Sequence, residues 1–203
     1  MKKAAIVIGI AIIIFGGYLL FFSSPNIKNS NPSGENIICF GDSLTYGTGA
    51  SGGMDYPAQL SKMISKPIIN AGVPGDTTDS ALERLEKDVL SRYPRIVLIT
   101  LGGNDLKNNV PKEIAFDNLT AIIKLIQSQG SLVIVGGIDV PLRGRGFGDS
   151  YKKLCDETGS LLIPNIFEGI MGKQGLMSDY IHPNNKGYTI MAEKFYKKIK
   201  PFL

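Results

Sequence analysis

From residue 37 onward, short apolar segments alternate with longer segments whose apolar residues repeat at helical spacing. The short segments are rich in Ile, Val and Leu and cover residues 37–40, 67–71, 96–101, 132–135 and 161–163. Uninterrupted apolar segments of this length are typical of strands buried on both faces. Helical patterns occupy residues 79–90, 114–129 and 188–199. This order predicts a parallel sheet with helices on both faces, and ligands bound beyond the carboxyl ends of its strands.

The part of the chain that is expected to fold, residues 36–203, is nearly neutral. Lys2, Lys3 and Lys28 are three of the 22 basic residues, and the remaining 19 are balanced by 18 acidic residues. A nucleic-acid-binding domain usually carries a basic stripe on its folded part. Four lysines near the carboxyl terminus, at positions 194, 197, 198 and 200, are typical of a solvated helix face. We therefore expect a single domain that is a monomer and binds no nucleic acid.

The amino-terminal segment has the features of a membrane anchor. Residues 4–22 carry no charge, and a helix of that length would measure about 28 Å, enough to cross a bilayer core. Cleaved signals usually have a shorter apolar region and a small-x-small cleavage site, so an uncleaved anchor over residues 1–22 is favoured over a secreted product. Lys2 and Lys3 predict that the domain lies outside the cytoplasm, at the periplasm or cell surface. Residues 23–35, rich in Ser, Asn and Pro, predict a tether.

The two cysteines do not indicate a metal site. Cys39 lies within an apolar segment and is expected to be a buried thiol, although an exported domain could pair it with Cys155. No Cys-x-x-Cys or Cys/His cluster is present, and the chain has one histidine. A zinc site normally needs several such ligands, so we expect no metal and no cofactor.

Three predicted strands end in segments that carry polar side chains. These segments are Gly41-Asp42-Ser43-Leu44, Asn70-Ala71-Gly72-Val73-Pro74-Gly75-Asp76-Thr77 and Gly102-Gly103-Asn104-Asp105. Helix caps and turns account for each segment taken alone. Because the ends of parallel strands meet at one edge, the segments also predict a nucleophile at Ser43 and oxyanion donors at Gly75 and Asn104.

The chain's one histidine lies in Asp179-Tyr180-Ile181-His182-Pro183. The following proline disfavours helix at His182, so a loop is expected there. A carboxylate three residues before the imidazole can hydrogen-bond one ring nitrogen and leave the other facing a serine. Nucleophile, base and a group that holds the base are the parts that covalent acyl transfer requires.

Together, in this order, these four segments resemble the GDSL/SGNH hydrolase family. The resemblance covers about residues 36–203 and is strongest to the small bacterial branch of arylesterases, acyl-CoA thioesterases and lysophospholipases. It implies a three-layer α/β/α sandwich whose five-stranded parallel sheet has the flavodoxin-like order 2-1-3-4-5. The Gly-x-Ser-x-Gly elbow of the α/β-hydrolases is absent around Ser43.

The resemblance also implies roles for individual residues. Ser43 would be the nucleophile, His182 the general base and Asp179 the residue that orients it. The oxyanion hole would consist of the Ser43 and Gly75 N–H groups and the Asn104 side chain; Gly72 is a competing choice for the glycine. The implied substrates are small esters, thioesters or lysolipids.

Substrate contacts are expected from Asp42 and from the segment that follows the fourth strand, residues 139–149. This segment should overhang the edge that carries Ser43, and its Phe147 is expected to contact the acyl chain; an exposed flexible loop is the alternative. Two other functions remain open at this point. One is an O-acetylesterase acting on cell-envelope carbohydrate, and the other is a catalytically silent, membrane-tethered binding protein.

Overall fold

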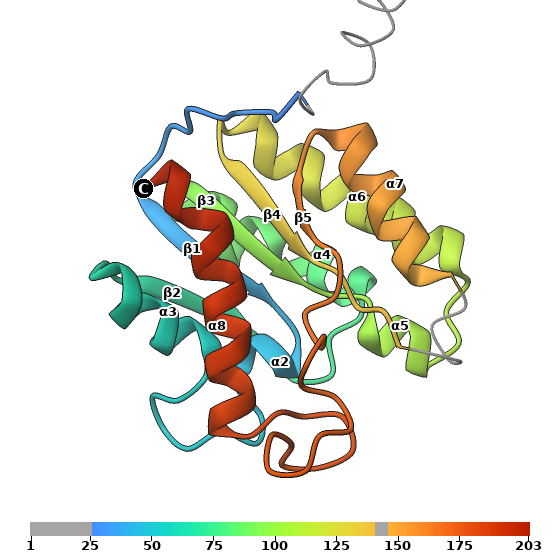
Figure 1. Ribbon diagram of the computed structural model, residues 1–203. Helices are drawn as coiled ribbons and strands as arrows, with labels where there is room; N and C mark the ends of the chain where they lie inside the picture. Colours follow the sequence, from blue (N-terminus) through green and yellow to red (C-terminus); the bar gives the residue numbers. More distant parts are fainter. Residues whose placement is uncertain (1–25, 141–145) are drawn as a thin grey trace, which may run out of the picture.

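The computed structural model describes residues 26–140 and 146–203, which form one parallel sheet covered by helices (Figure 1). Five strands are ordered β2-β1-β3-β4-β5, and every neighbouring pair is parallel. The strands are β1 (Asn36–Gly41), β2 (Ile68–Gly72), β3 (Pro94–Thr100), β4 (Leu132–Gly136) and β5 (Leu161–Ile163). Strand order and direction agree with the expectation for a flavodoxin-like sheet.

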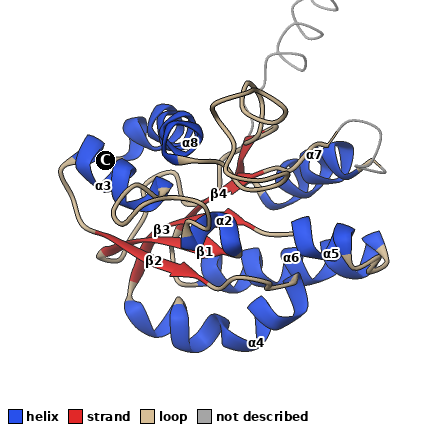
Figure 2. Cartoon of the chain, turned by 90° about the horizontal axis from the view of Figure 1, so that it is seen from below, coloured by secondary structure: helices blue, strands red, loops and turns tan. Residues whose placement is uncertain are grey.

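The helices form two layers, one on each face of the sheet (Figure 2). Helices α3 (Tyr56–Ile64) and α8 (Asn185–Ile199) pack against each other on one face. The other face carries α4 (Thr78–Asp88), α6 (Lys112–Ser128) and α7 (Phe147–Thr158). Two short helices, α2 (Ser43–Tyr46) and α5 (Gly103–Lys107), follow β1 and β3. Two 3₁₀ turns, Leu90–Arg92 and Lys200–Phe202, complete the described elements. The three-layer prediction is confirmed.

The core lies between the sheet and the two helical layers. The side chains of β1, β3 and β4 are almost completely buried, which explains their uninterrupted apolar sequences. Cys39 and Cys155 are both free and buried, as the apolar surroundings of Cys39 predict. Burial raises the pKa of Cys155 to about 12, so the thiol stays protonated at neutral pH.

Residues 26–35 lie along the amino-terminal edge of the sheet, where the sequence predicts a tether. Lys28 N donates to Gly159 O over 2.9 Å, before β5, and Asn29 Nδ2 donates to Ser131 O over 2.9 Å, before β4. Glu35 N donates to Tyr93 O over 2.9 Å, before β3. Side-chain and main-chain hydrogen bonds thus hold a segment whose polar composition suggests a free linker.

The predicted anchor, residues 1–22, lies outside the described residues. Within residues 26–140 and 146–203, no helix combines the length and apolar character needed to cross a membrane.

Candidate active site

The chain turns sharply at the carboxyl end of β1 and presents Ser43 at the first position of α2. Asp42 caps this short helix, since its Oδ1 accepts from Leu44 N over 2.9 Å. Glycine is needed at both neighbouring strand ends, because a Cβ on Gly41 would collide with Thr45 and Thr100, and one on Gly72 with the backbone at Tyr46. The two strand ends can therefore approach α2 closely, which fixes the position of Ser43.

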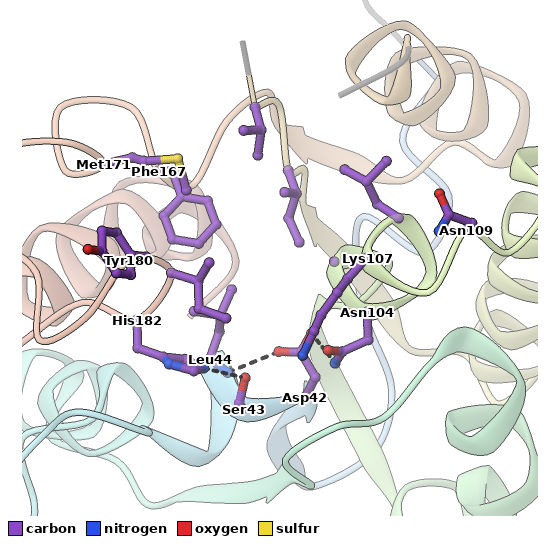
Figure 3. Close-up of a pocket in the computed structure, with 15 residues that line it drawn as sticks. Asp42, Ser43, Leu44, Asn104, Lys107, Asn109, Phe167, Met171, Tyr180 and His182 are labelled. Carbon is purple, nitrogen blue, oxygen red and sulfur yellow. Dashed lines mark hydrogen bonds between the residues drawn. The ribbon is translucent and has the colours of Figure 1, made fainter. Parts of the chain in front are cut away.

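The loop before α8 brings His182 to Ser43, 139 positions apart in the sequence. His182 Nε2 lies 3.0 Å from Ser43 Oγ (Figure 3). On the other side of the ring, His182 Nδ1 lies 2.7 Å from Asp179 Oδ2. An ionised carboxylate only accepts hydrogen bonds, so Asp179 favours the tautomer with the proton on Nδ1. This tautomer leaves Nε2 free to accept from the Ser43 hydroxyl.

The three-residue spacing from Asp179 to His182 also shapes the loop itself. Asp179 Oδ1 accepts from Ile181 N over 2.8 Å and from His182 N over 2.7 Å, while Ser178 N donates to His182 O over 2.8 Å. One carboxylate therefore holds both the backbone turn and the imidazole. The hydrogen bond from His182, followed by that from Ile181 N, lowers the pKa of Asp179 to about 2. The carboxyl group is consequently ionised throughout the neutral range.

Asp42 has the opposite electrostatic environment. It is only 3% exposed, and this burial raises the pKa of its carboxyl group to about 7, despite the hydrogen bond from Leu44 N. His182 lowers this pKa, whereas Asp76 and Asp105 raise it. A group beside Ser43 thus changes charge near neutral pH.

The ends of β2 and β3 bring two further predicted residues toward this edge. Asn104 Nδ2 donates to Asp76 O over 2.8 Å and lies 3.4 Å from Asp42 Oδ2. Gly75 occupies a tight turn with φ +91°, and Asp76 N donates to Val73 O over 3.2 Å. Pro74 followed by a positive-φ glycine is the sequence that a type II turn requires. The space around the Gly75 Cα is open.

Comparison with known proteins identifies the family. The sequence model of the GDSL-like Lipase/Acylhydrolase family matches residues 39–190, about three quarters of the chain. The chain belongs to this GDSL-like family. It is a carboxylic ester hydrolase, in agreement with the expectation from its four polar segments.

Relatives of this GDSL-like protein carry several hydrolase names. Esterase TesA of Pseudomonas aeruginosa is 28% identical over 83% of this chain and 90% of that protein. Thioesterase 1/protease 1/lysophospholipase L1 of Escherichia coli K12 is 29% identical over 83% of this chain and 85% of that protein. An acetylxylan esterase of Geobacillus stearothermophilus is 26% identical over 82% of this chain and 94% of that protein. A crystal structure of TesA superposes with a TM-score of 0.79 at 27% identity, covering 83% of this chain and 100% of that one.

A cavity of about 730 Å³ opens above Ser43 and His182 (Figure 3). One wall is mainly apolar, with side chains from α2 and from the segments that follow β4 and β5: Leu44, Ile138, Val140, Phe167, Met171 and Ile181. The opposite wall comes from α5 and the turn after it, and carries the polar side chains of Asn104, Lys107 and Asn109 beside Leu106. The cavity therefore offers an apolar and a polar side to a molecule bound at Ser43.

The structure does not place all predicted substrate contacts in this cavity. Asp42 lines its floor and Val140 lines its wall, but residues 141–145 lie outside the described residues. Phe147 is 2% exposed and packs edge-to-face on Phe116, with ring centroids 5.3 Å apart. The prediction that Phe147 contacts the acyl chain is wrong in this structure, because its ring is used in the core between α6 and α7.

Several residues of the site are absent from the sequence-based prediction. Phe167 and Met171 follow β5, at a four-residue spacing in a segment without regular structure. Tyr180, 98% exposed at the rim, is identifiable only by its position between Asp179 and His182.

Among the residues that the structure describes, no group of three or more His, Cys, Asp or Glu side chains could hold a metal ion.

Proposed function

We propose that this chain hydrolyses carboxylic esters and acyl thioesters through an acyl-enzyme on Ser43. The observation that carries the proposal is the chain of contacts from Ser43 Oγ to His182 Nε2, over 3.0 Å, and from His182 Nδ1 to Asp179 Oδ2, over 2.7 Å. Such a chain supplies a nucleophile, a general base and a carboxylate that stabilises the imidazolium. No metal or organic cofactor is needed for this chemistry.

In the first half of the reaction, Ser43 Oγ attacks the acyl carbonyl carbon and passes its proton to His182 Nε2. The carbonyl oxygen becomes an oxyanion that the Ser43 and Gly75 N–H groups and the Asn104 side chain stabilise. Asn104 Nδ2 has one N–H bonded to Asp76 O and directs the other at Asp42 Oδ2 over 3.4 Å. The second contact is long and therefore weak, so this N–H can donate to the oxyanion instead. His182 then protonates the leaving alcohol or thiol, and the acyl–leaving-group bond breaks.

In the second half, water replaces the leaving group. His182 takes a proton from water as its oxygen attacks the acyl-enzyme, and returns this proton to Ser43 Oγ as the carboxylic acid departs. Asp179 remains ionised in both halves, consistent with its low pKa.

The cavity supports an acyl substrate with an apolar chain. About 730 Å³ is within the range of pockets that enclose drug-sized ligands. Phe167, Met171 and Ile138 offer an acyl chain an apolar surface, and the names of the TesA and thioesterase relatives agree with this assignment. We therefore place small and medium-chain esters, thioesters and lysolipids first among substrates.

A second candidate is deacetylation of carbohydrate, favoured by the similarity to an acetylxylan esterase. The polar wall at Asn104, Lys107 and Asn109 could hydrogen-bond sugar hydroxyls. Comparison of kcat/KM for acetylated xylo-oligosaccharide and for p-nitrophenyl decanoate would distinguish these two functions. An enzyme with an acyl-chain pocket should have the larger kcat/KM for the decanoate.

The nucleophile is tested with a fluorophosphonate probe, which labels activated serines covalently. We expect stoichiometric labelling of the full chain and none of Ser43→Ala, with Ser91→Ala as the matched control. Labelling of Ser43→Ala at the normal rate would refute the assignment.

We also propose that residues 1–22 anchor the chain in a membrane, with the domain outside the cytoplasm. Lys28 is held at the amino edge of the sheet, and five residues between Phe22 and Lys28 span at most about 18 Å. The proposed active site lies at the opposite edge of the sheet. The two edges are separated by the length of the strands, which have up to seven residues at about 3.3 Å per residue. The cavity should therefore face away from the anchoring bilayer.

Alkaline carbonate extraction of membranes tests the anchor. Release of the full chain into the supernatant would exclude it.

A further inference from the structure

Arg84, on α4, is an arginine whose partners lie in three different segments of the proposed active-site edge. Its side chain is 15% exposed, and its Nε lies 2.5 Å from Asp76 Oδ2. Nη1 donates to Ala71 O over 3.0 Å, and Nη2 donates to Gly41 O over 2.9 Å. The guanidinium carbon also lies 4.4 Å from the centroid of the Phe40 ring.

These partners are adjacent to the groups that would bind the oxyanion. Gly41 ends β1, two residues before Ser43, and Ala71 precedes the last residue of β2. Asp76 directly follows Gly75 in the tight turn, and the carbonyl oxygen of Asp76 accepts from Asn104 Nδ2 over 2.8 Å. One guanidinium group thus connects the backbone before Ser43, the turn at Gly75 and, through Asp76, the Asn104 side chain.

The contacts require the shape of arginine as well as its charge. A guanidinium group is planar and has five N–H donors at fixed angles, so it can hold a carboxylate and two carbonyl oxygens at once. A lysine ammonium at the same position can pair with Asp76 but cannot bind all three oxygens in this plane. Replacement by lysine therefore keeps the charge and removes the fixed geometry.

We propose that Arg84 is a positioning residue for the oxyanion hole, holding the Gly75 turn and Asn104 in register with Ser43. This inference rests on the proposed function, because it concerns donors to an oxyanion formed at Ser43. Arg84 does not touch the reacting atoms, since its donors are used by Asp76, Ala71, Gly41 and Asp88. We therefore expect the loss of Arg84 to destabilise the transition state more than it weakens substrate binding.

The test compares Arg84→Lys with Arg92→Lys in the full chain. Arg92 is a matched control, since it pairs with Asp88 over 3.5 Å and is 42% exposed. For Arg84→Lys we expect kcat for p-nitrophenyl butyrate to fall about 10- to 100-fold with little change in KM, the cost of a small misplacement of catalytic groups. Arg92→Lys should match the wild type in both constants.

A second readout separates positioning from general stability. An alkylboronic acid forms a tetrahedral adduct with a nucleophilic serine and places an oxygen where the oxyanion forms. Its inhibition constant should rise for Arg84→Lys by the same factor by which kcat/KM falls, as expected for a transition-state analogue. A lower melting temperature with unchanged kcat/KM and boronate affinity would mean that Arg84 is only structural, and would overturn the proposal.

Asp76→Asn provides the same test if Arg84→Lys fails to fold. It keeps the size of the side chain and the carbonyl that holds Asn104, but removes the charge that pairs with Arg84. We expect the same loss of kcat and boronate affinity, and full activity in this variant would also contradict the proposal. Ser43→Ala is measured in parallel, since hydrolysis at the wild-type rate by that variant would refute the proposed function itself rather than the role of Arg84.

Discussion

Replacing Asp42 with asparagine should change how the stability of the protein depends on pH. The carboxyl group is 3% exposed, and burial raises its pKa from 3.8 to about 7. Asparagine has nearly the same shape, and its side-chain oxygen can still accept from Leu44 N, as Asp42 Oδ1 does over 2.9 Å. The substitution therefore removes the titration and keeps the helix cap.

The sign follows from proton binding in the two states. Between pH 3.8 and about 7, the folded protein retains a proton on Asp42 that the unfolded chain has released. Stability therefore falls as pH rises through this window, and above it the folded state carries the full cost of a buried charge. From pH 5 to pH 8.5 the loss is about 3 kcal/mol, because each pH unit at which the two states differ by a full proton contributes about 1.4 kcal/mol.

The assay is urea unfolding of the full chain, followed by circular dichroism at pH 5.0 and pH 8.5. Relative to the wild type, Asp42→Asn should gain about 3 kcal/mol in unfolding free energy on going from the lower to the higher pH. Asp117→Asn, which alters an exposed carboxyl group on α6, is the control and should follow the wild type. Equal pH dependence for Asp42→Asn and the wild type would refute the assigned protonation of Asp42.

Three further substitutions test the site by steady-state kinetics. Asp179→Asn removes the acceptor of the His182 Nδ1 hydrogen bond and should lower kcat on the order of 10⁴-fold; a loss below about tenfold would argue against its role. Asn104→Ala should lower kcat about 10²- to 10³-fold through loss of an oxyanion donor, and an unchanged kcat would remove it from the hole. Met171→Trp fills part of the cavity and should reduce kcat/KM for decanoate about tenfold relative to acetate. An unchanged acyl-length profile in that variant would mean that the chain binds elsewhere.

The strands were predictable because β1, β3 and β4 are buried on both faces and therefore have continuous apolar sequences. Parallel strand ends share one edge, so the polar segments after β1, β2 and β3 could be placed together without coordinates. Helix α7 was harder to predict, since it begins directly after a Gly- and Arg-rich segment that is typical of an exposed loop. Its first residue, Phe147, is a buried core side chain, although the segment before it predicts an exposed loop position.

Other parts of the site depend on contacts between segments that sequence patterns do not relate. Arg84 binds oxygens at Gly41, Ala71 and Asp76, and nothing in the helical pattern of α4 distinguishes it from a solvated arginine. The apolar cavity wall at Phe167 and Met171 comes from irregular backbone, where neither a two-residue nor a 3.6-residue period exists. The raised pKa of Asp42 likewise arises from burial that only the fold creates.

Hydrolysis of p-nitrophenyl esters from acetate to palmitate tests whether Ser43 carries out the reaction. The wild type should be active, and Ser43→Ala should lose a factor on the order of 10⁶ in kcat, the usual cost of removing such a serine. Its circular dichroism spectrum should be unchanged. Hydrolysis by folded Ser43→Ala at a rate near that of the wild type would show that Ser43 is not the nucleophile.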